Sequence, residues 1–441
     1  MLKFITPKYL APLFIIPSLV HALSLSEAIV QTIETNPQIS VKKEELLKQK
    51  ATLSGVKADY LPTVDLSYSV GYERTHTTGN KLLDTANNNG GLQNNTRQEA
   101  SANIRENLFR GLDTMYGVNQ QKALILSSGQ DVKKSANAMA LQTVNAYTDI
   151  LRTKEFLEIA QNNMEVHKKY LAQIKEKVNA GAGRNSDYKQ TLSRFENARS
   201  SLYLAEQNYK NAITTFQRLL PVKADATELE KPTIDKLPAT TLEELIQIAM
   251  KNNPDIHVSQ ADIQYAESTL KKSYATYYPT VDLEANAYWD QGLNGVRIDP
   301  DTQDRANILL LVKYNLFNGL SDKSLIQANQ HSLLKQNSTL ADTKRYVTAY
   351  TTIAFQTYNS AAIRLKYIEK NIVATAETVA DYQEEHDLGR RSLVDLLNIE
   401  LEYNNAKNRK VTAEYDRIIA YYQILAYTGK MLEAMHVTIE Q

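Results

Sequence analysis

Two stretches of the sequence, Leu61-Pro-Thr-Val-Asp-Leu66 and Tyr278-Pro-Thr-Val-Asp-Leu283, are nearly identical and lie 217 residues apart. After Pro62 and after Pro279 the chain alternates between apolar and polar residues. A period of two with one apolar face predicts a β-strand with one side in water. The recurrence of this pattern indicates that the fold is duplicated.

The duplication extends over most of the chain. Asn36-Pro37 recurs as Asn253-Pro254 at the same offset, and Asn107-Leu-Phe-Arg-Gly-Leu112 recurs as Asn315-Leu-Phe-Asn-Gly-Leu320 at an offset of 208. The landmarks of the repeat are Pro62, Pro279, Phe109, Gly111, Phe317, Gly319, Gly181 and Gly389. We therefore expect a first repeat over residues 23–221, an inter-repeat equatorial segment over 222–240, a second repeat over 241–429 and a C-terminal equatorial tail over 430–441.

Each repeat is expected to contain two strands. The first strands are predicted over about residues 62–74 and 279–290, and the returning strands over about 98–109 and 304–317. Loops rich in turn-forming residues separate the strands of each pair. Strands of this length can cross a bilayer at a tilt.

A very long helix follows each pair of strands. No proline occurs in residues 112–178 or 320–387, and apolar residues such as Val132, Met139 and Ala146 recur every seven positions. A sustained heptad pattern is typical of coiled coils rather than of helices in a globular domain. Each helix would form a rod about 100 Å long at a rise of 1.5 Å per residue.

The composition excludes several classes of protein. The 441 residues include no cysteine, 50 Lys+Arg, 50 Asp+Glu and seven scattered histidines. The lack of cysteine excludes disulfides, thiolate metal sites and a cysteine nucleophile. Because basic and acidic residues are equal in number, the sequence has no excess of positive charge, which argues against a protein that binds nucleic acid. We expect neither an enzyme nor a cofactor or metal site.

Residues 1–22 have the pattern of a secretory signal peptide. Lys3 and Lys8 precede a short apolar run, and Ala22 stands at the expected cleavage position. The run is too short for a spanning helix, and no later segment reaches about 18 consecutive apolar residues. The chain is expected to leave the cytoplasm, so any membrane span would be built from strands.

Four amphipathic strands leave open edges, because about eight strands are the minimum for a closed membrane barrel. Other copies of the chain would have to complete the sheet, so we expect oligomerisation. The alternative is an ordinary hairpin that packs on a helical bundle, with its aromatic residues in a core.

The order of these motifs in an exported, duplicated chain resembles the TolC family of outer-membrane efflux and secretion channels. The resemblance covers nearly the whole mature chain, and His386 to Leu397 is close to the family's second helix-turn motif. It implies a mainly α protein with a small membrane β-barrel part. Long antiparallel coiled-coil helices would form a periplasmic α-barrel tunnel, and four strands per protomer would complete a twelve-stranded barrel in a homotrimer.

The resemblance also implies a function. Gly181 to Asp187 and Tyr314 to Gly319 are more similar to the branch that serves type I secretion of adhesins than to the drug-efflux branch. The expected role is the exit duct of a type I secretion system, with a periplasmic adaptor (a membrane fusion protein) and an inner-membrane ABC transporter as partners. A duct for multidrug efflux and a soluble periplasmic coiled-coil adaptor are the alternatives.

The resemblance places a periplasmic gate at the two helix-turn-helix tips. The residues at matching positions are Ser186, Asp187, His386, Arg391, Asp395 and Asn398. A hydrogen bond from Arg391 to Ser186 or Asp187 would hold the entrance shut, and three copies of Asp395 would form a ring that favours cations. His386 stands where the family often has Tyr, and Asn398 where it can have a second Asp. The alternative role for Asp187 and Asp395 is to stabilise the N-termini of the following helices.

Overall fold

The computed structural model describes residues 23–76, 92–222, 229–291 and 302–439. The predicted signal peptide, residues 1–22, and residues 223–228 of the inter-repeat segment lie outside this part of the chain. The chain divides into two compact units. The described residues of the helical unit lie within Met1–Ser40, Ser135–Asn253 and Val347–Glu440, and those of the sheet unit lie within Val41–Lys134 and Pro254–Tyr346.

The described residues form the following elements in chain order: α1 (Leu25–Thr35), α2 (Pro37–Ala58), β1 (Thr63–His76), β2 (Leu92–Arg110), α4 (Asp113–Asn179), α5 (Asn185–Leu219), α6 (Leu242–Asn252), α7 (Pro254–Ser273), the 3-10 turn η2 (Tyr274–Tyr277), β3 (Thr280–Gln291), β4 (Thr302–Lys313), α8 (Ser321–Asp387), α9 (Leu393–Tyr427) and α10 (Met431–Ala434).

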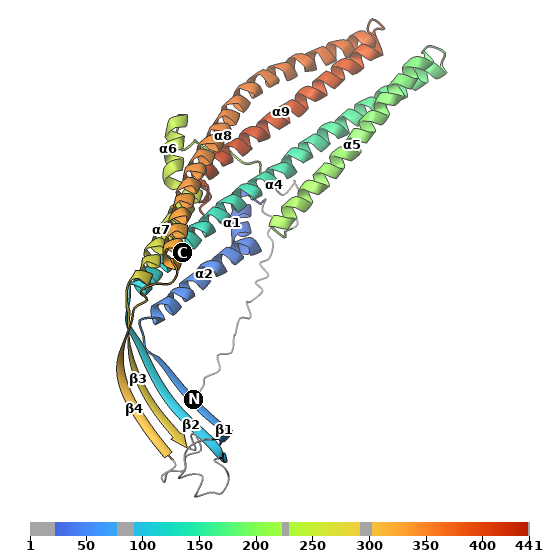
Figure 1. Ribbon diagram of the computed structural model, residues 1–441. Coiled ribbons are helices and arrows are strands. Elements are labelled where there is room, and N and C mark those ends of the chain that lie inside the picture. The colour runs from blue at the N-terminus through green and yellow to red at the C-terminus, as the bar shows by residue number, and fades with distance from the viewer. Residues whose placement is uncertain (1–22, 77–91, 223–228, 292–301, 440–441) are drawn as a thin grey trace. The chain divides into compact units, whose positions relative to one another are not determined.

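In the described part of the chain, four strands form one antiparallel sheet in the order β1-β2-β3-β4 (Figure 1). Strand β2 begins at Leu92, six residues before the predicted start. Strand β4 ends at Lys313, four residues before the predicted end. There the side chain of Asn315 accepts a hydrogen bond of 3.1 Å from the N–H of Phe317, which turns the chain out of the sheet.

The long helices α4 and α8 each contain 67 residues. Each folds back through a tight turn onto α5 or α9, and the two resulting hairpins are visible in Figure 1. Gly181 and Gly389 occupy the left-handed region at these turns, with φ of 75° and 74°. In the first turn Ala182 donates its N–H to the carbonyl of Lys177, a glycine-dependent helix end.

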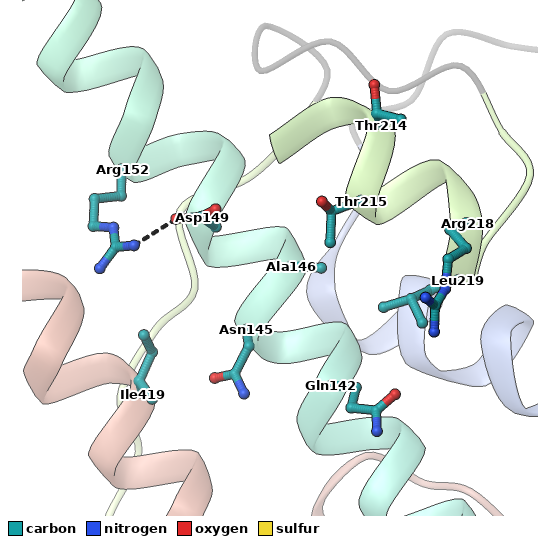
Figure 2. A pocket seen from close by; sticks show the side chains of 10 residues that line it. All are labelled: Gln142, Asn145, Ala146, Asp149, Arg152, Thr214, Thr215, Arg218, Leu219 and Ile419. Carbon is teal, nitrogen blue, oxygen red and sulfur yellow. Dashed lines mark hydrogen bonds and ion pairs between the residues drawn. The ribbon is translucent and has the colours of Figure 1, made fainter. Parts of the chain in front are cut away.

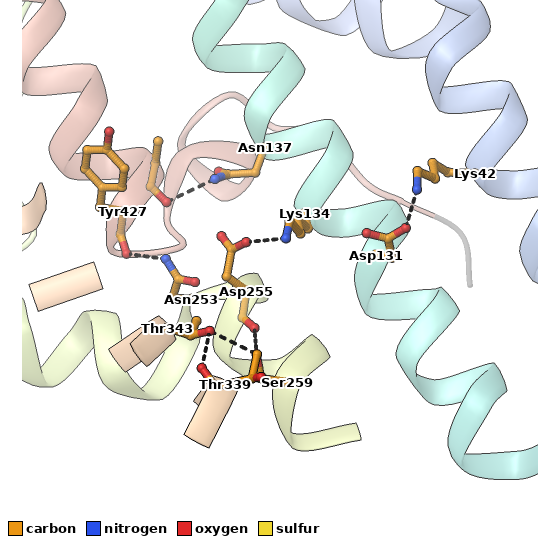
Figure 3. A network of polar contacts seen from close by, with 11 residues as sticks. Lys42, Asp131, Lys134, Asn137, Asn253, Asp255, Ser259, Thr339, Thr343 and Tyr427 are labelled. Atoms are coloured by element: carbon orange, nitrogen blue, oxygen red, sulfur yellow. Dashed lines mark hydrogen bonds and ion pairs between the residues drawn. The ribbon is translucent and has the colours of Figure 1, made fainter. Parts of the chain in front are cut away.

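The Asn-Pro pairs join the ends of distant helices in the helical unit. The Nδ2 of Asn36 donates to the carbonyl of Leu219 at 3.2 Å, and the Nδ2 of Asn253 donates to the carbonyl of Tyr427 at 2.9 Å (Figure 3). The Oδ1 of Asn36 also accepts the N–H of Gln38 at 3.0 Å. Each asparagine therefore begins one helix and satisfies the last carbonyl groups of another.

Replacing Asn36 with alanine should destabilise the helical unit by about 1–3 kcal/mol, because a buried carbonyl of Leu219 loses its donor. Asn36→Asp keeps the acceptor for Gln38 and should still lose most of this stability. Thermal unfolding of the detergent-solubilised protein measures both variants. The exposed Asn405→Ala variant is the control, and an equal effect in Asn36→Ala and Asn405→Ala would contradict this role.

The core of the helical unit gathers residues from both repeats. Its largest fully buried side chains include Ile29, Tyr147, Ile150, Phe216, Leu220 and Tyr415. Residues 229–237, which we call the belt, cross this core. The hydroxyl of Tyr147 donates to the carbonyl groups of Leu23 and Glu230 at 2.7 and 2.8 Å. Apolar residues of the tail pack on the same core.

Lys231 of the belt forms ion pairs with two helices. Its Nζ lies 3.2 Å from a carboxylate oxygen of Glu155 on α4 and 3.0 Å from one of Glu414 on α9. It also lies 5.1 Å from the centre of the Tyr415 ring, a cation–π distance. Although burial acts to lower the pKa of Lys231, the two carboxylates outweigh it and the pKa is raised. The belt is held by charge as well as by apolar contact.

Within residues 23–76, 92–222, 229–291 and 302–439, no helix combines the length and the apolar character needed to cross a bilayer.

Candidate functional site

One face of the sheet is apolar and exposed. The register aligns Val64, Ile104, Ala285 and Ile308 across the four strands, so their side chains share this face. Its large apolar residues with more than half of their surface exposed are Val64, Leu66, Tyr68, Val70, Tyr72, Ile308, Leu310 and Val312. An apolar surface that crosses a whole sheet is unusual for a protein in water and fits contact with lipid or another protein.

The opposite face is polar and internally bonded. The guanidinium of Arg105 and the amide of Asn107 each donate to Asp282 at 2.6 Å, and Asp282 is only 2% exposed. The hydroxyls of Ser67 and Ser101 lie 2.7 Å apart on the same face. Cross-strand pairs of this kind stabilise a sheet whose polar face remains in water. The sheet is therefore built to separate an apolar from an aqueous medium.

At the second helical tip, between α8 and α9, the side chain of Arg391 contacts residues of α8 in the same hairpin. Its Nε donates to Glu385 at 2.7 Å, and its guanidinium lies 4.0 Å from the centre of the Tyr382 ring. The hydrogen bond to Glu385 raises the pKa of Arg391. The Nδ1 of His386 lies 3.0 Å from the backbone carbonyl oxygen of Arg391. The structure thus brings His386 and Arg391 together around the turn at Gly389.

The aspartates of both tips lie in the first turns of helices. Asp395 is in the first turn of α9, where its N–H donates to the hydroxyl of Ser392 and its carboxylate accepts from that hydroxyl at 2.7 Å. Asp187 is in the first turn of α5 and accepts a hydrogen bond of 3.2 Å from Ser186. Both positions stabilise the partial positive charge of a helix N-terminus.

The structure joins the two hairpins through other polar residues. Asn398 on α9 accepts a hydrogen bond of 2.8 Å from Arg194 on α5, and Tyr170 on α4 donates to Gln383 on α8 at 2.6 Å. Within the described chain, no hydrogen bond or ion pair links Arg391 to Ser186 or Asp187. The predicted links from Arg391 are therefore not made inside one copy.

Sequence reasoning missed two buried ionisable residues near these contacts. His167 on α4 is 5% exposed, and among the described residues its Nδ1 has no hydrogen-bond partner. Burial lowers the pKa of His167, with a further contribution from Arg194. Glu400 on α9 is 8% exposed, and burial raises its pKa. The sequence could have indicated that His167 is buried, because it occupies a position in an apolar heptad column of α4.

Acidification should weaken this region through His167. Because its pKa is lower in the folded state than the ordinary 6.5, the unfolded chain binds the proton first as the pH falls through 6.5. Glu400 acts in the opposite direction, since its raised pKa means that the folded state takes up the proton first and gains stability as the pH falls toward 4.5. The wild type should therefore lose a few degrees in melting temperature between pH 7 and pH 5.5, and His167→Gln should not show this loss. An identical pH dependence in the wild type and His167→Gln would contradict the prediction, and Glu400→Gln is the control with the opposite sign.

A groove is lined by residues of α4, the C-terminal end of α5 and α9 (Figure 2). Its volume is about 780 Å³, and it is lined by Gln142, Asn145, Ala146, Asp149, Arg152, Thr214, Thr215, Arg218, Leu219 and Ile419. Arg152 and Asp149 form an ion pair of 2.5 Å along one edge.

The comparisons with known proteins define the class of this chain. Residues 28–221 and 245–430 match the family described as "Outer membrane efflux protein", and the chain belongs to this family. Its two matched segments fall one in each repeat. Members of the family are outer-membrane channels rather than enzymes, so the predictions of a channel and of an outer-membrane location are confirmed.

Individual relatives are described as an outer membrane protein, a secretion protein and an outer membrane channel. The chain is 20% identical to outer membrane protein TolC of Escherichia coli (strain K12), over 97% of this chain and 87% of that protein. It is also 20% identical to the alkaline protease secretion protein AprF of Pseudomonas aeruginosa, over 94% and 86%. The solved Campylobacter jejuni CmeC outer membrane channel superposes with a TM-score of 0.79 at 14% identity, covering 92% of this chain and 86% of that chain. The predicted TolC-like fold is confirmed.

Proposed function

We propose that the chain forms a homotrimeric outer-membrane duct that passes a protein substrate to the exterior. The observation that carries this proposal is the two-faced sheet, whose apolar face is exposed and whose outer strands β1 and β4 are unpaired edges. An exposed edge with an apolar face must be covered by lipid and by other strands. Three copies would supply twelve strands, enough to close a barrel around water.

The helices would continue this passage into the periplasm. Amide, hydroxyl and charged groups of seven lining side chains reach the groove on α4, whose surface is otherwise apolar, and these groups would allow water to wet this wall. Such a wall suits a cargo that moves without specific binding. The passage would dock on a periplasmic adaptor and an inner-membrane ABC transporter, which would supply the energy that a passive duct lacks.

A role in type I secretion is supported by the tip sequence from Gly181 to Asp187 and by the similarity to AprF, whose name describes protease secretion. The family description, which names efflux, keeps small-molecule efflux as the second candidate.

The entrance of the duct would lie at the helical tips. We propose that in the trimer Arg391 reaches Ser186 or Asp187 of a neighbouring hairpin, and that His386 and Asn398 line the same constriction. The exposure of residues 184–186 and 387–390 supports this arrangement, because both turns are open to contact with another copy. Asp395 would repeat around the threefold axis as a ring of carboxylates.

Asp395→Asn should weaken the block of the channel by trivalent cations about tenfold or more, because the ring loses three negative charges. Single-channel recording in planar bilayers with increasing hexamminecobalt measures the effect. Glu402→Gln, an exposed carboxylate further along α9, is the control and should leave the block unchanged. Undiminished block in Asp395→Asn would exclude the ring.

A deletion strain tests the cargo. The proteome of the cell surface and medium is compared with that of the parent, together with sensitivity to a panel of toxic compounds. Loss of one large exported protein with unchanged sensitivity is expected. An intact exported proteome with new sensitivity would instead establish efflux as the function.

A further inference from the structure

The groove of Figure 2 combines an apolar floor with unused hydrogen-bond donors. The surface that faces it is mostly apolar, and Ala146 and Leu219 lie buried in its floor. Its volume of about 780 Å³ is in the range of sites that bind small organic molecules, which are lined mainly by apolar groups with a few polar groups among them. A ligand of this groove would therefore have an apolar body.

The groove carries a positive charge that no carboxylate within it balances. Arg152 is ion-paired with Asp149, the only carboxylate among the described lining residues. The second arginine, Arg218, is exposed and makes no hydrogen bond or ion pair in the part of the chain that the structure describes. An anionic group on the ligand would supply the partner that Arg218 lacks.

Two amides of α4 add uncharged donors to the groove. The side chains of Gln142 and Asn145 are exposed, and among the described residues they make no hydrogen bond. The hydroxyls of Thr214 and Thr215 already donate to carbonyl oxygens of α5, at 3.0 and 2.9 Å. The groups that remain free to donate are therefore amide and guanidinium groups, which suit the oxygens of a carboxylate or a sulfonate.

The second repeat shows that this pair of helices can form without the polar groups. Helices α8 and α9 begin and end 208 residues after α4 and α5, so each groove residue of α4 and α5 has a structural equivalent. At the positions that match the two arginines, the second repeat has Ser360 and Ala426. At the position that matches Asn145 it has Ile353. Because the same helical hairpin forms without these charges and this amide, we infer that in the first repeat they serve a ligand rather than the fold.

We propose that the groove binds a small organic anion, a carboxylate or sulfonate on an apolar ring system. The acid group pairs with Arg218 and accepts a hydrogen bond from an amide of α4, and the ring system covers the apolar floor. In Figure 2 the side chains of Arg152 and Arg218 lie on opposite sides of α4, so Arg152 stays with Asp149 while Arg218 holds the acid group. This ligand is distinct from the protein cargo proposed above, because a groove of this volume admits only a small molecule.

Equilibrium dialysis with radiolabelled 2-naphthoate tests the proposal on purified full-length protein in lipid nanodiscs, with empty nanodiscs as the blank. We expect saturable binding about tenfold or more tighter than that of 2-naphthamide, the neutral analogue of the same shape, because the charge-assisted bonds are lost in the amide. Arg218→Gln should weaken the binding of naphthoate about tenfold or more and leave that of naphthamide unchanged. The matched control is Arg199→Gln, which removes the same charge from an exposed position elsewhere on α5.

Arg218→Ala introduces the residue that the second repeat has at the matching position. It should abolish the binding of naphthoate while its melting temperature stays within a few degrees of that of the wild type. The proposal is overturned if naphthoate shows no saturable binding, if it binds no better than naphthamide, or if Arg218→Gln and Arg199→Gln bind it equally. A fall in melting temperature of more than about ten degrees in Arg218→Ala would also overturn it, because the arginine would then serve the fold. The deletion strain measures the cargo separately, so failure of this site and failure of the proposed function give different results.

Discussion

Gly429→Ala should prevent stable folding of the helical unit. Gly429 has a φ of 70°, and a Cβ there would lie 2.3 Å from the carbonyl oxygen of Asn252. The left-handed backbone costs an L-residue about 1–2 kcal/mol. The backbone collision adds to it, because α9 and the α6–α7 junction must separate, so we expect a total loss above about 4 kcal/mol. The yield of folded protein in the outer membrane fraction and its melting temperature measure the effect.

Gly181→Ala is the matched control for this substitution. Its φ is 75°, but nothing lies within 4 Å of the added Cβ. It should therefore lose only the backbone part, about 1–2 kcal/mol, and remain assembled. Comparable losses in Gly429→Ala and Gly181→Ala would show that the contact with Asn252 contributes little.

Arg391→Ser should raise single-channel conductance severalfold. The guanidinium is held in place by Glu385 and Tyr382, and we expect this preorganised group to close the entrance through a charge-assisted bond to another hairpin. Serine carries no charge, and its side chain is too short to reach the other hairpin. The measurement is single-channel recording of purified protein in planar bilayers at fixed ionic strength.

Arg390→Ser removes the same charge from the neighbouring exposed position and serves as the control. Its conductance should be close to that of the wild type. If Arg391→Ser also leaves conductance unchanged, Arg391 does not close the entrance, and its pairing with Glu385 only stabilises the turn.

The sequence predicted the elements that depend on local pattern. The alternation after Pro62 and Pro279 placed both first strands, and the absence of proline placed both long helices, because period and backbone chemistry act within a few residues. The early end of β4 could not be predicted in this way. Its apolar alternation continues to Leu316, and the strand ends where pairing with β3 ends, which is a property of the sheet.

Contacts between distant segments were also beyond the sequence pattern. The heptad columns of α4 included Val132 and Met139 but not Tyr147, which is fully buried because the belt packs on a further side of the helix. At the tip, the family resemblance supplied Arg391 and the two aspartates, with Ser186 or Asp187 as the expected partner of Arg391, but it did not supply Glu385 or Tyr382. Glu385 and Tyr382 contact Arg391 because the chain turns back at Gly389. The spacing of residues along the sequence does not tell which side chains meet across such a turn.

The core of the helical unit has a consequence for the order of events during biosynthesis. Tyr147 and Phe216 are made in the first half of the chain, but they share their core with Tyr415, Ile418 and Met431 from its far end. The ribosome delivers these late residues about 200 positions after Phe216. Until then the first half carries an apolar patch that it cannot cover by itself, which is the condition under which nascent chains aggregate. The early half must therefore be kept from aggregating until the late half arrives.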